Sequence, residues 1–436
     1  MPREILENKR KALKINLDEA IYGTFAEIGA GQEVARNFFT AGAASGTIAK
    51  TMSAYDMAFS NSIYGSEESG RYVSESRLDK MIRHEYGLLS ERLHGPQYEN
   101  KTFFAFADTV STLNFNKTND PHGWLGIRFQ LTPGGEPHEI VFHVRLLDSD
   151  SNLQQNVLGV LGVNLVYAAY FYNNNLQAMI ESLVDNLSVG SVEIDLISIS
   201  GPQFKNANDR LVNLYLIAKG FSGAAIFDPN GEVRQSKDVL YKKDVMILRT
   251  KFGQKSTPNF DLFNRAVEQF KRSQKVEDKN IIVLIEVLMT NFLDDTAEIG
   301  NNELEKFAER AEELCATGNH VIVSDFARNH KLAQYLSRCN PKSVGISTNI
   351  SNLRNIFNSE NYSENYTDEL LAYISDLFSK KAKLYAYPYL DKTNNQIITT
   401  RNMPVSKEAK HLFEFLVQNG YITDIDDYDT KDVKTV

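Results

Sequence analysis

Short apolar runs alternate with segments of helical periodicity along most of this 436-residue chain. The run Asn280–Met289 is the most apolar, and its Ile, Val and Leu content is typical of a strand that is buried on both faces. It precedes an amphipathic segment at 301–315, and the apolar run 320–325 precedes another at 330–338. Because strands that alternate with helices build parallel sheets, we predict an α/β fold with two Rossmann-like lobes and mixed, mostly parallel sheets.

The length of the chain suggests two or three domains, or one core and a lobe. We predict an N-terminal α/β lobe over 1–200, a C-terminal α/β lobe over 201–420 and an acidic flexible tail over 421–436. Blocks 159–200 and 342–390 both suggest the order strand, helix, strand. In block 159–200 the first strand is expected within the apolar run 157–166. This similarity indicates either an internal duplication or only the pattern that all Rossmann-like units share.

Composition and charge exclude several classes of protein. With 47 basic and 56 acidic residues the net charge is −9, which is unlike a generic nucleic-acid binder. No run approaches the roughly 20 apolar residues of a membrane span, and the N-terminus lacks the apolar core of a signal peptide. The two cysteines lack C-x-x-C spacing, which favours free thiols in a reducing compartment. We therefore expect a cytoplasmic protein that binds neither membranes nor nucleic acid.

The segment from Glu27 to Ala35 carries the clearest ligand-binding pattern. An expected strand ends at Gly29-Ala30-Gly31, and an expected helix begins near Gln32. Glycines after a strand let the chain turn tightly and let a phosphate approach the N–H groups of the following helix. The match to G-x-G-x-x-G is partial, since Val34 occupies the third glycine position. The pattern predicts either a nucleotide-binding loop formed by Glu27, Gly29, Gly31 and Gln32, or a tightly packed turn.

A second small-residue segment, 41–47, follows this helix. Ser45 and Thr47 provide hydroxyl groups, and Lys50 provides a positive charge within reach of an anion. The segment lacks P-loop spacing. We include Ser45, Thr47 and Lys50 in the candidate nucleotide site, and we interpret 52–57 as helical.

Other polar residues offer weaker candidates. Asp108, Asp148, Asp195 and Asp325 lie near the ends of expected strands, where they either contact a ligand or cap a helix. His122 precedes the only tryptophan, Trp124, and His143 lies within an expected strand. Because no H-E-x-x-H or H-x-H spacing occurs, the sequence predicts no metal site.

Residues 1–65 and about 101–200 resemble a bacterial family that often carries the label nicotinate- or nicotinamide-nucleotide adenylyltransferase. The resemblance is carried by Tyr22–Arg36 and Lys50–Asp56. It implies a protein that handles pyridine nucleotides. Adenylyltransferases of that class hold the triphosphate with H-x-G-H, whereas the first histidine here is His84. Ser347, Thr348 and Arg354 are loosely similar to a later segment of that class.

Two functions from different classes follow. The first is a nucleotide- or phosphate-ligand-binding protein, and its enzymatic form is a nucleotidyltransferase-like enzyme that acts on pyridine nucleotides. The alternative is a non-catalytic, self-assembling scaffold protein. In both cases we expect a homo-oligomer, because the segment 39–65 is rich in small residues and carries Met52, Met57, Phe59 and Tyr64. The sequence leaves open whether the chain is an enzyme and whether it uses a nucleotide as a cofactor.

Overall fold

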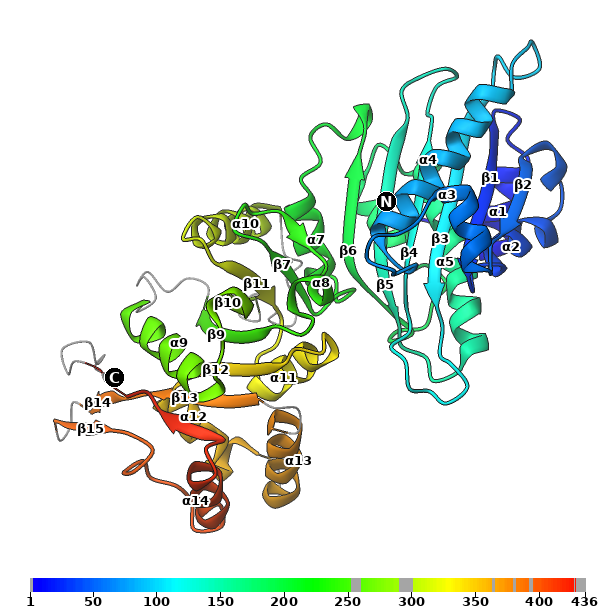
Figure 1. Cartoon of the computed structure of the whole chain (residues 1–436). Helices are drawn as coiled ribbons and strands as arrows, with labels where there is room; N and C mark the ends of the chain where they lie inside the picture. Colours follow the sequence, from blue (N-terminus) through cyan, green and yellow to red (C-terminus); the bar gives the residue numbers. More distant parts are fainter. Residues whose placement is uncertain are drawn as a thin grey trace. The chain divides into compact units, whose positions relative to one another are not determined.

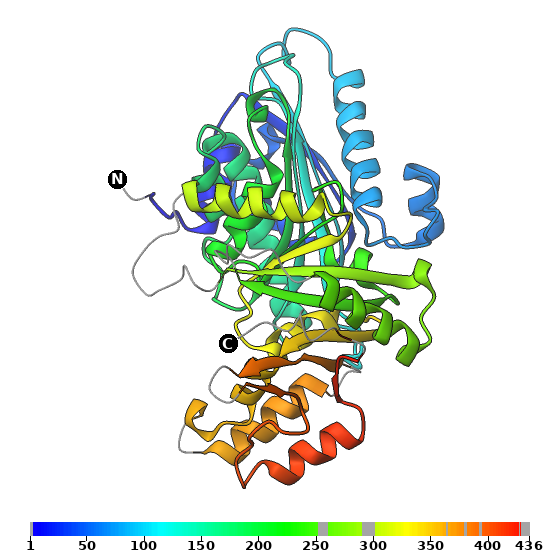
Figure 2. The same ribbon diagram turned by 90° about the vertical axis from the view of Figure 1, so that its left-hand side faces the viewer.

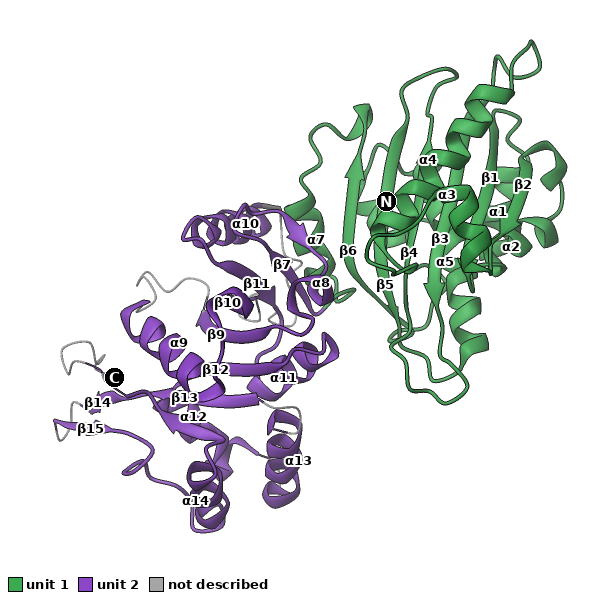
Figure 3. Ribbon diagram, in the orientation of Figure 1, with its two compact units in different colours: residues 1–222 green, residues 223–436 purple. Residues whose placement is uncertain are grey.

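The computed structural model describes residues 3–251, 260–289, 301–362, 365–378, 382–391, 395–426 and 428. Its contacts divide the chain into two compact units, residues 1–222 and 223–436 (Figures 1 and 3). Each unit is built around one large sheet. The predicted α/β fold with mixed, mostly parallel sheets is confirmed.

Unit 1 contains a six-stranded sheet in the order β2-β1-β3-β4-β5-β6. Strands β1 and β2 and strands β1 and β3 are parallel, whereas β3 to β6 run antiparallel to one another. The strands are β1 (Ile21–Gly29), β2 (Ile48–Ser53), β3 (Thr102–Ser111), β4 (His122–Phe129), β5 (His138–Leu146) and β6 (Val192–Ser200).

Helices cover both faces of this sheet. On one face, Tyr86 and Leu89 of α4 pack against Phe103, and Figure 2 shows this long helix running beside the strands. On the other face, Phe38 of α2 contacts Phe25 of β1. The helices of unit 1 are α1 (Asn8–Asn16), α2 (Glu33–Ala41), α3 (Met57–Tyr64), α4 (Glu75–Arg92), α5 (Ser151–Phe171), α6 (Leu176–Ser182) and α7 (Asp209–Ala218).

Unit 2 contains an eight-stranded sheet in the order β16-β13-β12-β9-β10-β11-β7-β8. From β16 to β11 every neighbouring pair is parallel. Within this parallel part of the sheet, β9 comes first in the chain, β10 and β11 are added on one side of it, and β12, β13 and β16 are then added on the other side. This is the strand order of a doubly wound Rossmann sheet, and its topological switch point lies between β9 and β12.

The elements of unit 2 follow from alternating buried strands and amphipathic helices on both faces of the sheet. The strands are β7 (Ala224–Phe227), β8 (Val233–Arg234), β9 (Asp244–Lys251), β10 (Ile281–Leu288), β11 (His320–Ser324), β12 (Ser343–Asn349), β13 (Ala382–Tyr387), β14 (Tyr389–Asp391), β15 (Gln396–Ile398) and β16 (Ile422–Asp424). The helices are α8 (Ser236–Leu240), α9 (Phe260–Gln274), α10 (Asn301–Cys315), α11 (Asn329–Arg338), α12 (Ile350–Ile356), α13 (Tyr366–Phe378) and α14 (Lys410–Gln418).

Two predicted elements are wrong. The apolar run 157–166 belongs to the helix α5 rather than to a strand, because its residues are buried all round between other elements. Residues 48–53 form the edge strand β2, where we expected Met52 to be helical. With a helix in place of its first strand, block 159–200 differs from block 342–390, so the similarity does not support a duplication.

The C-terminal segment joins the sheet before the chain reaches its acidic end. Ile422 and Ile425 are buried, and residues 422–424 pair with β13 as strand β16. Burial of these two side chains accounts for the ordered strand within the segment that we predicted as a tail. Residues 427 and 429–436 of that predicted tail lie outside the described residues.

Candidate functional site

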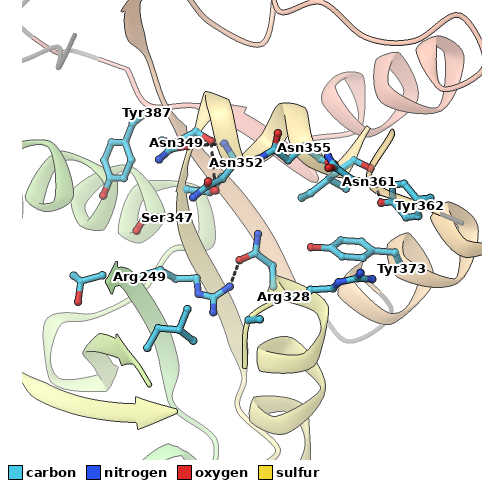
Figure 4. Close-up of a pocket in the computed structure, with 16 residues that line it drawn as sticks. Arg249, Arg328, Ser347, Asn349, Asn352, Asn355, Asn361, Tyr362, Tyr373 and Tyr387 are labelled. Atoms are coloured by element: carbon cyan, nitrogen blue, oxygen red, sulfur yellow. Dashed lines mark hydrogen bonds between the residues drawn. The ribbon is translucent and has the colours of Figure 1, made fainter. Parts of the chain in front are cut away.

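A cavity of about 460 Å³ lies at the switch point of unit 2. Its walls come from the carboxyl ends of β9, β12 and β13, which contribute Arg249, Ser347 and Tyr387 respectively. Figure 4 shows these side chains facing the same space as residues of α12 and α13. In open α/β sheets, ligands bind outside the carboxyl ends of the strands at such a point. The topology therefore places the cavity where a ligand is expected.

Arg249 has a fixed position in the wall of the cavity. Its guanidinium forms an ion pair with the buried carboxylate of Glu286 and donates hydrogen bonds to Asn329 Oδ1 (2.5 Å) and to the carbonyl oxygen of Phe326. The hydroxyl of Ser324 donates to the same carboxylate at 2.6 Å. Because Glu286 balances its charge, Arg249 serves mainly to brace the end of β9.

Arg328 differs from Arg249 in its partners. It precedes α11, lines the cavity and is exposed, and no hydrogen bond or ion pair joins its side chain to the described residues. None of the described residues that line the cavity is acidic. An exposed guanidinium in such a wall attracts anions and matches the geometry of a phosphate or a carboxylate.

Asparagines form a second part of the wall. Asn349, Asn352, Asn355 and Asn361 line the cavity, and they occur at intervals of three or six residues after β12. The side chain of Asn349 caps α12 by accepting from Asn352 N at 2.6 Å, and Asn361 Nδ2 donates to Asn355 O at 2.9 Å. The side-chain amides of Asn352 and Asn355 make no hydrogen bond to the described residues. These two amides provide donors and acceptors for hydroxyl or base groups.

Tyrosines complete the cavity. Burial raises the pKa of Tyr362 and of Tyr373 to about 12, and it also raises the pKa of Tyr387, so all three stay neutral at physiological pH. The hydroxyl of Tyr387 is buried and lacks a hydrogen-bond partner within the described residues. An uncharged aromatic ring suits the flat face of a base, and an unpartnered hydroxyl suits a polar ligand atom.

The predicted loop after β1 has a different environment, in unit 1. The φ angle of Gly29 is +93°, whereas the φ angle of Gly31 lies outside the left-handed region. A Cβ on Gly31 would lie 2.0 Å and 2.1 Å from the two carboxylate oxygens of Asp108. Glycine at position 31 is therefore required by the close approach of Asp108. The side chain of Gln32 donates back to Gly29 O at 2.7 Å.

Two buried carboxyl groups lie beneath this loop. Glu27 of β1 and Asp108 of β3 are register partners, and both are fully or almost fully buried. Ser53 donates to one oxygen of Glu27 at 2.8 Å, but neither oxygen of Asp108 has a partner within the described residues. Burial, and then the charge of Glu27, raise the pKa of Asp108 well above its usual value. A phosphate bound beside these two carboxyl groups would be repelled whenever either of them is ionised.

The structure separates the remaining predicted residues from the loop. Since β2 runs parallel to β1, Ser45 and Thr47 lie near the start of β2, at the opposite edge of the sheet from Gly29–Gln32. Thr47 is buried and its hydroxyl donates to Asn16 O at 3.1 Å. Lys50 Nζ lies 2.6 Å from a carboxylate oxygen of Glu85. Ser45 is exposed.

The sequence patterns did not predict the unit 2 cavity, although one signal was present. Asparagine recurs at every third position from Asn349 to Asn361, directly after an expected strand. Ser347 and Thr348, which are loosely similar to a later segment of the adenylyltransferase class, also line the cavity. Arg249, Arg328 and Tyr387 come from segments far apart in sequence, so only the folded sheet brings them together.

Comparisons with known proteins give little further information. No family model matches the sequence, and no curated protein matches it. Similar solved structures include the competence/damage-inducible protein CihA from Agrobacterium tumefaciens, at 15% identity and a TM-score of 0.28, with 38% of this chain and 98% of that chain covered. A competence or damage-inducible protein from Enterobacter asburiae has 13% identity and a TM-score of 0.27, covering 37% and 96%. A CinA superfamily protein from Klebsiella pneumoniae has 10% identity and a TM-score of 0.28, covering 37% and 96%. Likeness at this level carries no conclusion about function.

The described residues contain no helix that is long and apolar enough to cross a membrane. They also contain no group of three or more His, Cys, Asp or Glu side chains arranged to hold a metal ion.

Proposed function

We propose that unit 2 binds a nucleotide, a small molecule that joins phosphate to a planar base, in the cavity at its switch point. The observation that carries this proposal is the lining: an exposed arginine, available amides and neutral tyrosines, with no acidic residue among the described lining residues. Arg328 attracts the phosphate, Asn352 and Asn355 bind sugar hydroxyls or base edges, and Tyr387 contacts the base. A cavity of this size is in the range of small-molecule sites.

The wider functional class follows from this proposal. The cavity supports the hypothesis of a nucleotide- or phosphate-ligand-binding protein, and pyridine nucleotides are one candidate group. The loop site in unit 1, with Glu27, Gly29, Gly31 and Gln32, stays a prediction. Of the two locations we favour unit 2. A phosphate bound at the unit 1 loop would lie next to Glu27 and Asp108, two acidic groups that are already buried away from solvent.

Calorimetric titration of the full-length protein with ADP, NAD and adenosine tests the proposal. We expect ADP and NAD to bind, and Arg328→Ala to weaken their binding by roughly tenfold or more, since charge-assisted hydrogen bonds contribute about 1.5–3 kcal/mol. Binding of adenosine, which has no phosphate, should change little. Arg401→Ala is the matched control, because Arg401 is an exposed arginine of the same unit that does not line the cavity. Equal effects of the two substitutions, or no binding at all, would contradict the proposal.

A further inference from the structure

Three polar side chains in unit 2 form a hydrogen-bonded chain that leads from a buried carboxylate to the cavity. Glu286 of β10 is fully buried, and it forms an ion pair with Arg249 of β9. Arg249 Nη1 donates in turn to Oδ1 of Asn329, the first residue of α11, at 2.5 Å. Figure 4 draws this hydrogen bond as the dashed line that leaves Arg249. Arg249 and Asn329 both line the cavity, so the chain ends where a ligand would lie.

The guanidinium of Arg249 is held from several sides. Arg249 Nη2 donates to Glu286 Oε1 at 3.2 Å, and the Ser324 hydroxyl on β11 donates to the same oxygen at 2.6 Å. Arg249 Nη2 also donates to the carbonyl oxygen of Phe326. Groups on β9, β10 and β11 therefore fix the guanidinium, and the guanidinium in turn holds the segment that carries Arg328 and leads into α11.

The chemistry of Arg249 determines how the side-chain amide of Asn329 is oriented. A guanidinium group has donors and no acceptor, so the amide oxygen, and not the NH2 group, must face it. A flipped amide would place its own N–H groups against those of Arg249. The NH2 group of Asn329 therefore points away from Arg249, and it makes no hydrogen bond to any group in the described part of the chain.

The two side chains at the start of α11 consequently offer donors to a ligand. Arg328, directly before the helix, carries a guanidinium, and the amide oxygen of Asn329 is already used by Arg249. The dipole of the helix favours negative charge at the same end. A hydroxyl or a neutral amide would bring donors as well as acceptors to this point, whereas the oxygens of an ionised phosphate only accept.

We propose that Asn329 binds the phosphate of the nucleotide together with Arg328, and that Arg249 and Glu286 are positioning residues that keep its amide in the donating orientation. This inference rests on the nucleotide site proposed above for unit 2. It assigns the selection for an ionised phosphate to a neutral amide as well as to an arginine. A ligand without a phosphate therefore gains nothing from Asn329.

Asn329→Asp tests this proposal by calorimetric titration of the full-length protein with ADP and with adenosine. Aspartate is close in size to asparagine and still accepts from Arg249, but it turns a carboxylate oxygen toward the ligand in place of the NH2 group. We expect ADP binding to weaken by roughly tenfold or more, and adenosine binding to change little. Asn230→Asp is the matched control, because it adds the same charge at an exposed asparagine of unit 2 that does not line the cavity.

The outcomes of this titration separate the inference from the proposed function. Equal ADP affinity in Asn329→Asp and the parent protein, or an equal loss in Asn230→Asp, would overturn the inference alone. Equal losses for ADP and adenosine would also overturn it, because they would show a change that does not involve the phosphate. A parent protein that does not bind ADP would contradict the proposed function, and this inference with it.

The positioning role of Arg249 and Glu286 has its own test. Arg249→Met combined with Glu286→Gln removes both charges, so no unpaired charge is left buried. The amide of Asn329 is then free to turn, and we expect ADP affinity to fall while adenosine affinity changes little. A merely structural role would affect both ligands alike, and that result, or unchanged ADP affinity, would overturn the positioning role.

Nitrogen NMR of the parent protein, labelled with ¹⁵N-asparagine, provides a test that does not depend on a variant folding. We expect saturating ADP to shift the side-chain NH2 signal of Asn329, because its N–H groups then donate to phosphate oxygens. Adenosine should leave that signal in place. No shift with ADP, or the same shift with adenosine, would overturn the proposal.

Discussion

Replacing Asp108 with asparagine should change how the stability of unit 1 depends on pH. Asp108 is fully buried, and neither of its carboxylate oxygens has a partner within the described residues. Its pKa is raised well above the usual value of 3.8, mainly because the carboxyl group is buried and secondly because of the nearby charge of Glu27. Asparagine is close in size to aspartate and cannot ionise. The variant therefore removes the titration while keeping the packing against Gly31.

The sign of the effect follows from proton linkage. Between the pKa of the unfolded chain, near 3.8, and the higher pKa of the folded state, the folded protein binds more protons than the unfolded chain. Protonated Asp108 contributes its full stabilisation below its pKa in the unfolded chain. That contribution is lost as the pH rises toward its pKa in the folded protein. In that window the loss is about 1.4 kcal/mol per pH unit. Asp108→Asn should therefore gain stability relative to the parent protein as the pH rises.

Urea unfolding at a series of pH values measures this difference. Trp124 is the only tryptophan and is buried in unit 1, so its fluorescence reports the unfolding of that unit. Asp79→Asn is the control, because Asp79 is an exposed carboxylate on α4. A plot of the free energy of unfolding of Asp79→Asn against pH should stay parallel to that of the parent protein. A constant difference between Asp108→Asn and the parent protein from pH 4 to pH 8 would refute the assignment of a raised pKa.

Three further predictions follow from particular residues. Gly31→Ala should destabilise unit 1 by about 1–3 kcal/mol through overpacking, and by much less when Asp108 is also replaced with alanine. An equal loss of unfolding free energy in both backgrounds, measured by urea unfolding, would disprove a contact between position 31 and Asp108. The protein should be a homo-oligomer, since Tyr55, Met57 and Phe59 expose large apolar side chains near the edge strand β2; light scattering that gives a 49.3 kDa monomer at micromolar concentration would exclude this. The protein should not make NAD from a pyridine mononucleotide and ATP, because it lacks H-x-G-H; turnover near ~1 per second in a coupled assay would contradict this.

Local patterns predicted much of the fold. The buried strand that became β10 and the amphipathic helices α10 and α11 all have signals within a few neighbouring residues. The pattern failed at α5, where a helix buried on all sides has the same apolar run as a strand. A short apolar run does not distinguish these two environments.

The candidate sites were harder to predict because they depend on strand order. The glycine pattern predicts either a phosphate or a packed turn at Gly31, and the group that approaches Gly31 in the structure is Asp108, from a strand about 75 residues later in the chain. The unit 2 cavity likewise exists only because the chain crosses back from β11 to β12.

A crystal structure of the full-length protein grown with saturating ADP tests the central claim most directly. We predict density for the nucleotide in unit 2, with its phosphates beside Arg328 and its base near Tyr387. Density beside Gly29–Gln32 in unit 1 would instead support the site predicted from the glycine loop. That result, or an empty unit 2 cavity at saturating ADP, would contradict the claim that the switch point of unit 2 binds nucleotides.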